Sequence, residues 1–138
     1  MTLSGGRGAR QRRFRWLWIG YWSGLFILMH VPKPAGVSLP MQYSDKVIHF
    51  ALYLGLTLLG GYAQRLWHHP AATPALVMWA AVYAAYGAFD EWLQQFVGRS
   101  NSLMDWLADV AGITTGTLVL WYIRRPRAAA QPPQTTQL

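Results

Sequence analysis

Four long apolar segments follow one another along the chain, separated by shorter polar connections. They occupy residues 16–31, about 47–66, 74–97 and 103–123. A helix needs about 20 residues to cross a bilayer, with a usual range of about 17–25, so the last three segments are long enough and the first is slightly short. None alternates apolar and polar residues with period two over a useful length, which argues against a β-barrel. The pattern predicts an all-α membrane bundle of four transmembrane helices.

The two ends of the chain lack this apolar pattern. Residues 1–15 are rich in Gly and Arg, and residues 124–138 are rich in Ala, Pro and Gln. Such compositions are typical of disordered segments. We therefore expect a disordered basic tail over 1–15, one four-helix transmembrane domain over 16–123 and a disordered tail over 124–138.

The first apolar segment has two interpretations. A basic start followed by a short apolar stretch is typical of a cleaved secretory signal. However, the segment contains Trp16, Trp18 and Trp22, and Gly20 and Gly24 have the spacing that favours close packing of membrane helices. We favour an uncleaved helix.

Composition supports the lipid bilayer as a partner and argues against nucleic acid. Hydrophobic residues make up 53% of the chain and charged residues only 12%, against about 25% charged in soluble domains. The net charge is +7, but the arginines cluster beside apolar segments, as membrane-flanking charges do. The chain has no Cys, which excludes disulfides and thiolate metal sites.

The distribution of Lys and Arg predicts the orientation. With four spans, both Arg clusters and Arg65 lie on one side of the membrane, and only Lys33, Lys46 and Arg99 lie on the other. Because cytoplasmic segments carry the excess of basic residues, both termini are predicted to be cytoplasmic.

All five carboxylates then fall on the outer side. Asp45 begins the second segment, Asp90 and Glu91 lie near the end of the third, and Asp105 and Asp109 lie in the first turns of the fourth. Asp45 could simply cap its helix, and Ser102 with Asp105 fits a capping box. Asp90 and Glu91 have no such role, because the helix dipole disfavours anions near a carboxyl end. Two interpretations of these carboxylates remain: a packing network between helices, and a functional polar cavity.

Helical spacing indicates which of these groups share a face. Asp45, His49 and Tyr53 form one row on the second segment, and Tyr86, Asp90 and Gln94 form another on the third. On the fourth, Gly112 and Gly116 lie near the stripe of Asp109 and would let a neighbouring helix approach closely. His30 is interpreted as interfacial. The candidate functional cluster consists of Asp45, Lys46, His49, Asp90, Glu91, Gln95, Arg99, Asp105 and Asp109.

Two stretches together resemble the VanZ-like family of small membrane proteins. They are DKVIHFALYLGL and FDEWLQQFVGRSNSLMDWLADVAGITTG, and the likeness covers roughly residues 44–116. Gln94-Gln95 leaves open which Gln corresponds to the family's, and Asp109 stands where the family usually has Asn. The resemblance implies a multi-pass protein of the bacterial cytoplasmic (inner) membrane. The family takes its name from a member linked to resistance against teicoplanin, a glycopeptide antibiotic whose targets lie outside the membrane.

Three functions remain open. The cluster could bind a lipid-linked or cell-wall-related ligand at the outer leaflet, with Lys46 and Arg99 holding an anionic group. It could instead form a membrane-embedded hydrolase or transferase acting on a lipid phosphate or peptide-like group, with His49 and the carboxylates as acid, base or metal ligands. A transporter is less favoured, because the acids gather on one side.

No organic cofactor is expected. Against the hydrolase or transferase, the chain has no Gly-x-Ser-x-Gly and no His-x-x-x-His motif. A divalent metal stays open, and a site with one His and several carboxylates suits Mg²⁺ or Mn²⁺ better than Zn²⁺.

Overall fold

The computed structural model describes residues 4–31, 42–66, 73–98 and 102–123, and these form helices and turns with no strand among them. The elements are α1 (Ser4–His30), α2 (Gln42–Ala63), α3 (Thr73–Gln94), a short 3₁₀ helix η2 (Gln95–Val97) and α4 (Leu103–Ile123). The prediction of an all-α bundle is therefore confirmed for the described part of the chain. The predicted tail over 124–138 lies outside it.

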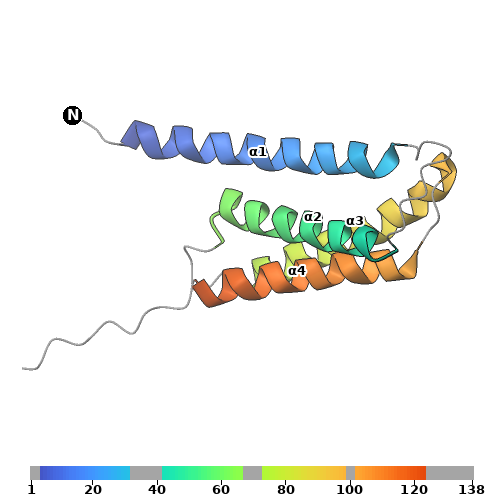
Figure 1. Cartoon of the computed structure of the whole chain (residues 1–138). Helices are drawn as coiled ribbons and strands as arrows, with labels where there is room; N and C mark the ends of the chain where they lie inside the picture. The colour runs from blue at the N-terminus through green and yellow to red at the C-terminus, as the bar shows by residue number, and fades with distance from the viewer. Residues whose placement is uncertain (1–3, 32–41, 67–72, 99–101, 124–138) are drawn as a thin grey trace, which may run out of the picture.

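Successive helices run antiparallel, so each end of the bundle collects two amino ends and two carboxyl ends (Figure 1). At the end where α2 and α4 begin and α1 and α3 finish lie all five carboxylates: Asp45, Asp90, Glu91, Asp105 and Asp109. We call this the acidic end. The opposite end, which we call the basic end, has Arg10, Arg12, Arg13, Arg15 and Arg65. The described part of the chain thus has a strong charge asymmetry along its long axis.

Helix α1 begins much earlier than the sequence predicts. Residues 1–15 were expected to form a disordered tail, but the helix runs from Ser4. The reason is contact with the end of α2. The side chain of Gln11 donates to the carbonyl of Ala63 and accepts a 2.9 Å hydrogen bond from Nε of Arg65. In addition, the Phe14 ring lies 4.3 Å from the ring of Tyr62, centroid to centroid.

Helices α2 and α4 pack closely through two glycines of α4. A Cβ atom added to Gly112 would lie 2.3 Å from the carbonyl oxygen of Phe50, and one added to Gly116 would lie 2.9 Å from the side chain of Thr57. The predicted role of these two glycines in close packing is confirmed. The same prediction is wrong for Gly20 and Gly24, because an added Cβ at either position meets nothing within 4 Å among the described residues.

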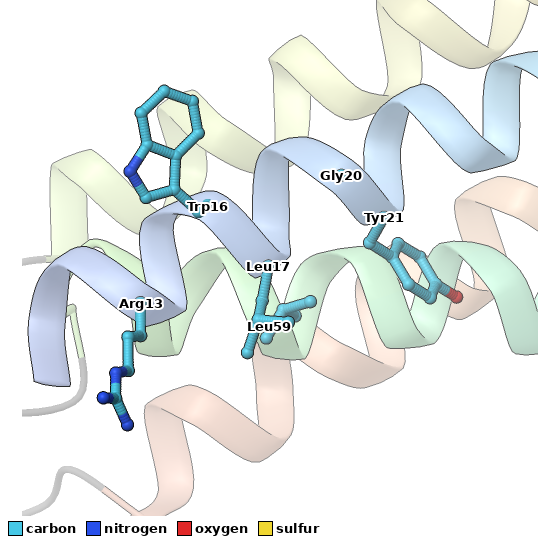
Figure 2. Close-up of a pocket in the computed structure, with 6 residues that line it drawn as sticks. All are labelled: Arg13, Trp16, Leu17, Gly20, Tyr21 and Leu59. Atoms are coloured by element: carbon cyan, nitrogen blue, oxygen red, sulfur yellow. The ribbon is translucent and has the colours of Figure 1, made fainter.

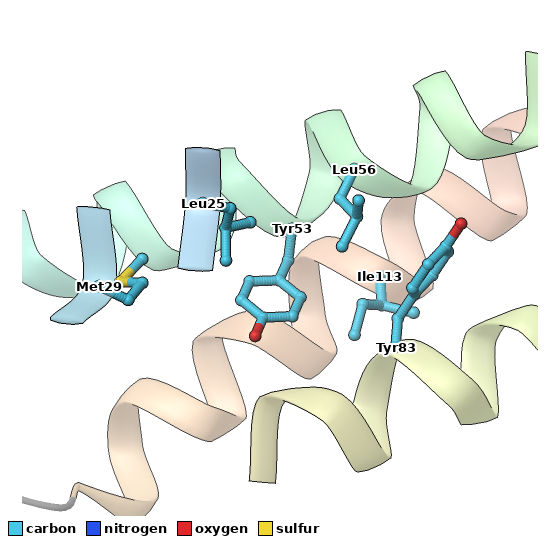
Figure 3. Close-up of a cluster of buried hydrophobic side chains, with 6 residues drawn as sticks. All are labelled: Leu25, Met29, Tyr53, Leu56, Tyr83 and Ile113. Atoms are coloured by element: carbon cyan, nitrogen blue, oxygen red, sulfur yellow. The ribbon is translucent and has the colours of Figure 1, made fainter. Parts of the chain in front are cut away.

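An apolar core joins all four helices below the acidic end. Its buried members are Leu25, Met29, Tyr53, Leu56, Tyr83 and Ile113 (Figure 3). Aromatic rings extend it between α1 and α3. Trp18 lies edge-on to Trp79 at 5.3 Å between centroids, and Trp22 lies edge-on to Tyr83 at the same separation. This core fixes how α1 and α3 sit against α2.

Much of the outer surface of the bundle is apolar. Exposed large hydrophobic residues occur on every α-helix, including Ile27, Val47, Val77 and Leu118. Two segments, Asp45–Ala63 and Leu103–Ile123, are long and apolar enough to cross a membrane. The other two expected spans do not meet this criterion. The apolar part of α1 directly follows Arg12, Arg13 and Arg15, and α3 carries Asp90 and Glu91.

Candidate functional site

Three side chains from three helices meet at the centre of the acidic end. Nδ1 of His49 on α2 lies 2.9 Å from Oδ1 of Asp109 on α4 and 3.8 Å from Oε1 of Glu91 on α3. The exposed fractions of His49, Asp109 and Glu91 are 1%, 1% and 3%. We call these three residues the buried triad. Helical rows position them, since His49 follows Asp45 by one turn and Asp109 follows Asp105 by one turn.

The start of α4 is held by groups from two other helices. The backbone N–H of Asp105 donates to Oγ of Ser102 at 3.3 Å, which confirms half of the predicted capping box. The other half differs. Oε2 of Glu91 accepts the N–H of Ser102 at 2.9 Å, and the Asp105 carboxylate instead pairs with Nζ of Lys46 at 3.0 Å. The cap therefore ties α3 to α4 and fixes the orientation of Glu91.

Asp90 occupies a neighbouring buried position. Its Oδ2 accepts a 3.2 Å hydrogen bond from Nε2 of Gln94, one turn later on α3. Its Oδ1 lies 3.6 Å from Nδ1 of His30, at the end of α1. His30 also donates from Nδ1 to the carbonyl of Phe26 at 2.8 Å. His30 was interpreted as interfacial, and sequence reasoning missed its contact with Asp90 because nothing in the α1 pattern points to a partner on α3.

Gln95 does not belong to the cluster. It is exposed and donates from Nε2 to the carbonyl of Trp92 at 2.6 Å, whereas Gln94 is 2% exposed and faces Asp90. The structure therefore does not bring Gln95 together with the other candidates. The i+4 row through Asp90 favoured Gln94, and η2 begins at Gln95, where the tighter 3₁₀ turn carries that side chain away from the bundle.

Asp45 and Arg99 are the remaining two of the nine candidate residues. One ligand atom each from Asp45, His49 and Asp105 lies within 4.8 Å of the other two, so Asp45 stands next to the buried triad. Arg99 lies outside the described residues. The structure thus brings together seven of the nine predicted residues: Asp45, Lys46, His49, Asp90, Glu91, Asp105 and Asp109.

Tyr53, in the same row of α2 as Asp45 and His49, adds a polar group on the core side of the triad. Its side chain is fully buried, and its hydroxyl has no hydrogen-bond partner among the described residues. A Cβ atom built on Gly87 would lie 3.3 Å from this hydroxyl and 3.2 Å from Oδ2 of Asp109. A side chain at Gly87 would therefore crowd both polar groups.

A separate apolar groove lies toward the basic end. It has a volume of about 730 Å³ and lies between α1 and α2 (Figure 2). Its lining residues are Arg13, Trp16, Leu17, Gly20, Tyr21 and Leu59. The polar groups that line it are Arg13, the indole N–H of Trp16 and the hydroxyl of Tyr21, which donates to the carbonyl of Leu52 at 2.9 Å. None of these is a carboxylate or a histidine. The acidic end is accordingly the better candidate for function.

The chain matches no family model, no curated protein and no solved structure.

The chemistry available at the acidic end follows from the geometry alone. A histidine held by one carboxylate and close to a second can move a proton, bind an anionic group when it is protonated, or ligate a cation together with the carboxylates. Lys46, whose side chain is 37% exposed, is placed at the edge of the cluster, where it can meet an anionic ligand.

Proposed function

We propose that this chain is a multi-pass protein of the bacterial inner membrane with a VanZ-like domain of four transmembrane helices. The apolar outer surface and the two segments of spanning length support the membrane setting. The charge asymmetry supports an orientation with the basic end in the cytoplasm, where both termini would lie, and the acidic end outside.

The antiparallel order of helices supports four spans. α2 and α4 both run from the acidic end to the basic end. If both cross the membrane in the same direction, the chain between them has to return across it, and α3 is the segment that does so. α1 packs along α2 and α3 over the same length, through Trp18, Trp22 and Leu25.

At the outer face, the acidic end binds a lipid-linked or cell-wall-related ligand of the envelope. The observation that carries this proposal is the burial of His49, Asp90, Glu91 and Asp109 inside an otherwise apolar bundle. A charged side chain in the membrane interior costs about 2.5–3.5 kcal/mol on insertion scales. Groups kept at such a cost are functional candidates by default. Lys46 would contact the anionic head of the ligand, and a role in glycopeptide resistance would follow from binding a cell-wall precursor.

The hydrogen bond between His49 and Asp109 favours a second candidate function, a membrane-embedded hydrolase or transferase. A carboxylate that holds one ring nitrogen orients the imidazole for acid–base work at the other. The substrate would be a lipid phosphate or a peptide-like group, with Glu91 as the second carboxylate.

Binding of polyprenyl phosphates tests the main proposal. Purified wild-type protein in detergent is expected to retain undecaprenyl pyrophosphate in native mass spectrometry, in preference to phosphatidylglycerol. Lys46→Met should reduce this retention at least tenfold, because the variant removes the partly exposed cation at the cluster. Gln95→Ala, at the same end but outside the cluster, is the matched control. Equal retention of both lipids by all three proteins would refute the proposed ligand class, and conversion of the bound lipid would favour the enzyme.

A further inference from the structure

The charges at the acidic end do not balance among the described residues. Asp105 is paired with Lys46, the only described Lys or Arg at this end. Glu91 and Asp109 are left with His49 between them, in a place from which water is almost excluded. Buried carboxylates are usually paired or bound to a metal ion, because an isolated buried charge is very costly.

The buried triad is compact enough to hold a metal ion. One ligand atom each from His49, Glu91 and Asp109 lies within 4.8 Å of the other two. In an octahedral site with metal–ligand distances of about 2.1 Å, neighbouring ligand atoms lie about 3.0 Å apart. The 2.9 Å gap between His49 and Asp109 fits this spacing, and the 3.8 Å gap to Glu91 needs only a small closure.

Two buried polar atoms at the triad or beside it have no hydrogen-bond partner among the described residues, and one of them, Oε1 of Glu91, lies 3.8 Å from Nδ1 of His49. Oε1 of Glu91 is buried beside His49 and has no hydrogen-bond partner among the described residues, although Oε2 of the same carboxylate is held by the N–H of Ser102. The hydroxyl of Tyr53 is likewise buried and unpartnered, close to Asp109. Metal-binding carboxylates are commonly held in this way, with one oxygen fixed by a hydrogen bond from a neighbouring group and the other oxygen left for the metal.

We propose that His49, Glu91 and Asp109 bind one divalent cation through Nδ1, Oε1 and Oδ1. The ion takes the place of the hydrogen between Nδ1 of His49 and Oδ1 of Asp109, which leaves as a proton or moves to Nε2, so that the imidazole is neutral and the two carboxylates balance the charge of the ion. One nitrogen and two oxygens favour Mn²⁺ or Mg²⁺ over the softer, nitrogen- and sulfur-seeking metals. Three protein ligands leave coordination positions for water or for an anionic ligand. The cation site does not depend on the envelope ligand proposed above.

Mn²⁺ binding to the full-length protein tests this proposal. Wild-type protein in detergent, first stripped with a chelator, is titrated with Mn²⁺ while free Mn²⁺ is followed by electron paramagnetic resonance. One ion per chain is expected. Asp109→Asn and Glu91→Gln keep side-chain size and remove one anionic ligand each, so each should weaken binding at least tenfold. Asp105→Asn is the matched control, because it removes a neighbouring carboxylate that is already paired with Lys46.

Each result has a defined meaning. Failure of the wild-type protein to bind Mn²⁺ overturns the proposal. It is also overturned if Asp105→Asn loses Mn²⁺ binding while Asp109→Asn keeps it, because that result would place the ion at Asp45, His49 and Asp105. If the triad variants do not fold, the wild-type stoichiometry and its melting temperature with and without Mn²⁺ decide, with a rise of several degrees expected. No envelope ligand is present in these measurements, so their failure is separate from failure of the proposed function.

Discussion

At the residue scale, two glycines of the same chain have opposite surroundings. Gly112 sits against the backbone of α2, so an added methyl group would meet a carbonyl oxygen that cannot move aside cheaply. Gly24 on α1 has open space around its Cβ position among the described residues. Both glycines belong to a pair with GxxxG spacing in the sequence. They differ in that another helix packs against Gly112 and none of the described helices packs against Gly24.

Gly112→Ala is expected to destabilise the protein by about 1–3 kcal/mol, the usual cost of overpacking. Gly24→Ala should be neutral or slightly stabilising, because Ala is the better helix former. Thermal unfolding of both variants in the same detergent, followed by circular dichroism, measures the difference. Equal melting temperatures would mean that α2 and α4 do not pack through Gly112.

At the scale of single elements, the cores of the helices were predictable and their ends were less so. The apolar pattern gave α2, α3 and α4 within a few residues. It missed the first turns of α1, because the contacts of Gln11 and Phe14 are with residues far along the chain and leave no local signal. It also could not decide between Gln94 and Gln95, since the answer depends on where α3 gives way to η2.

The change of helix type at the end of α3 leads to a prediction. Gln94→Ala removes a buried hydrogen bond to Asp90 and should lower stability by about 1–2 kcal/mol. Gln95→Ala removes an exposed contact and should change stability by less than about 0.5 kcal/mol. The two variants have the same composition, so their melting temperatures can be compared directly. A larger effect at Gln95 would place the end of α3 differently.

The candidate cluster was predictable in outline from the rows of residues on each helix. Rows place His49 with Asp45, and Asp109 with Asp105, without any knowledge of the fold. The rows do not show which row of one helix contacts which row of its neighbour. The pairing of His49 with Asp109, and the capture of the Ser102 N–H by Glu91, required the three-dimensional arrangement.

At the scale of the whole molecule, the chain is a bundle with charge of opposite sign at its two ends. The described arginines lie at one end and all five carboxylates at the other. Such an arrangement matches the electrostatic rule for membrane insertion, and it also gathers the five carboxylates with His30 and His49 on one face. The proposed orientation therefore decides which compartment supplies the ligand.

Labelling of single-Cys variants in intact cells tests this orientation, and the absence of native Cys makes it direct. Ser100→Cys, in the connection between α3 and α4, is expected to react with a membrane-impermeant thiol reagent. His69→Cys and Thr136→Cys should react only after the cells are opened. The reverse pattern would place the acidic end in the cytoplasm and require an intracellular ligand. Reaction of all three in intact cells would contradict the proposed topology.

The pairing of His49 with Asp109 joins residues 60 positions apart, and this has a consequence for biosynthesis. Translation completes α2 before the first residue of α4 has been added to the chain. In the proposed membrane setting, the nascent α2 reaches the translocon with its histidine still without the carboxylate that holds it in the finished bundle. Lateral release of α2 alone would place that polar side chain against lipid. The last helix to be synthesised is therefore the one that completes the acidic end. A chain truncated before α4 would keep an unpaired polar side chain in the membrane and would be a substrate for membrane quality-control proteases.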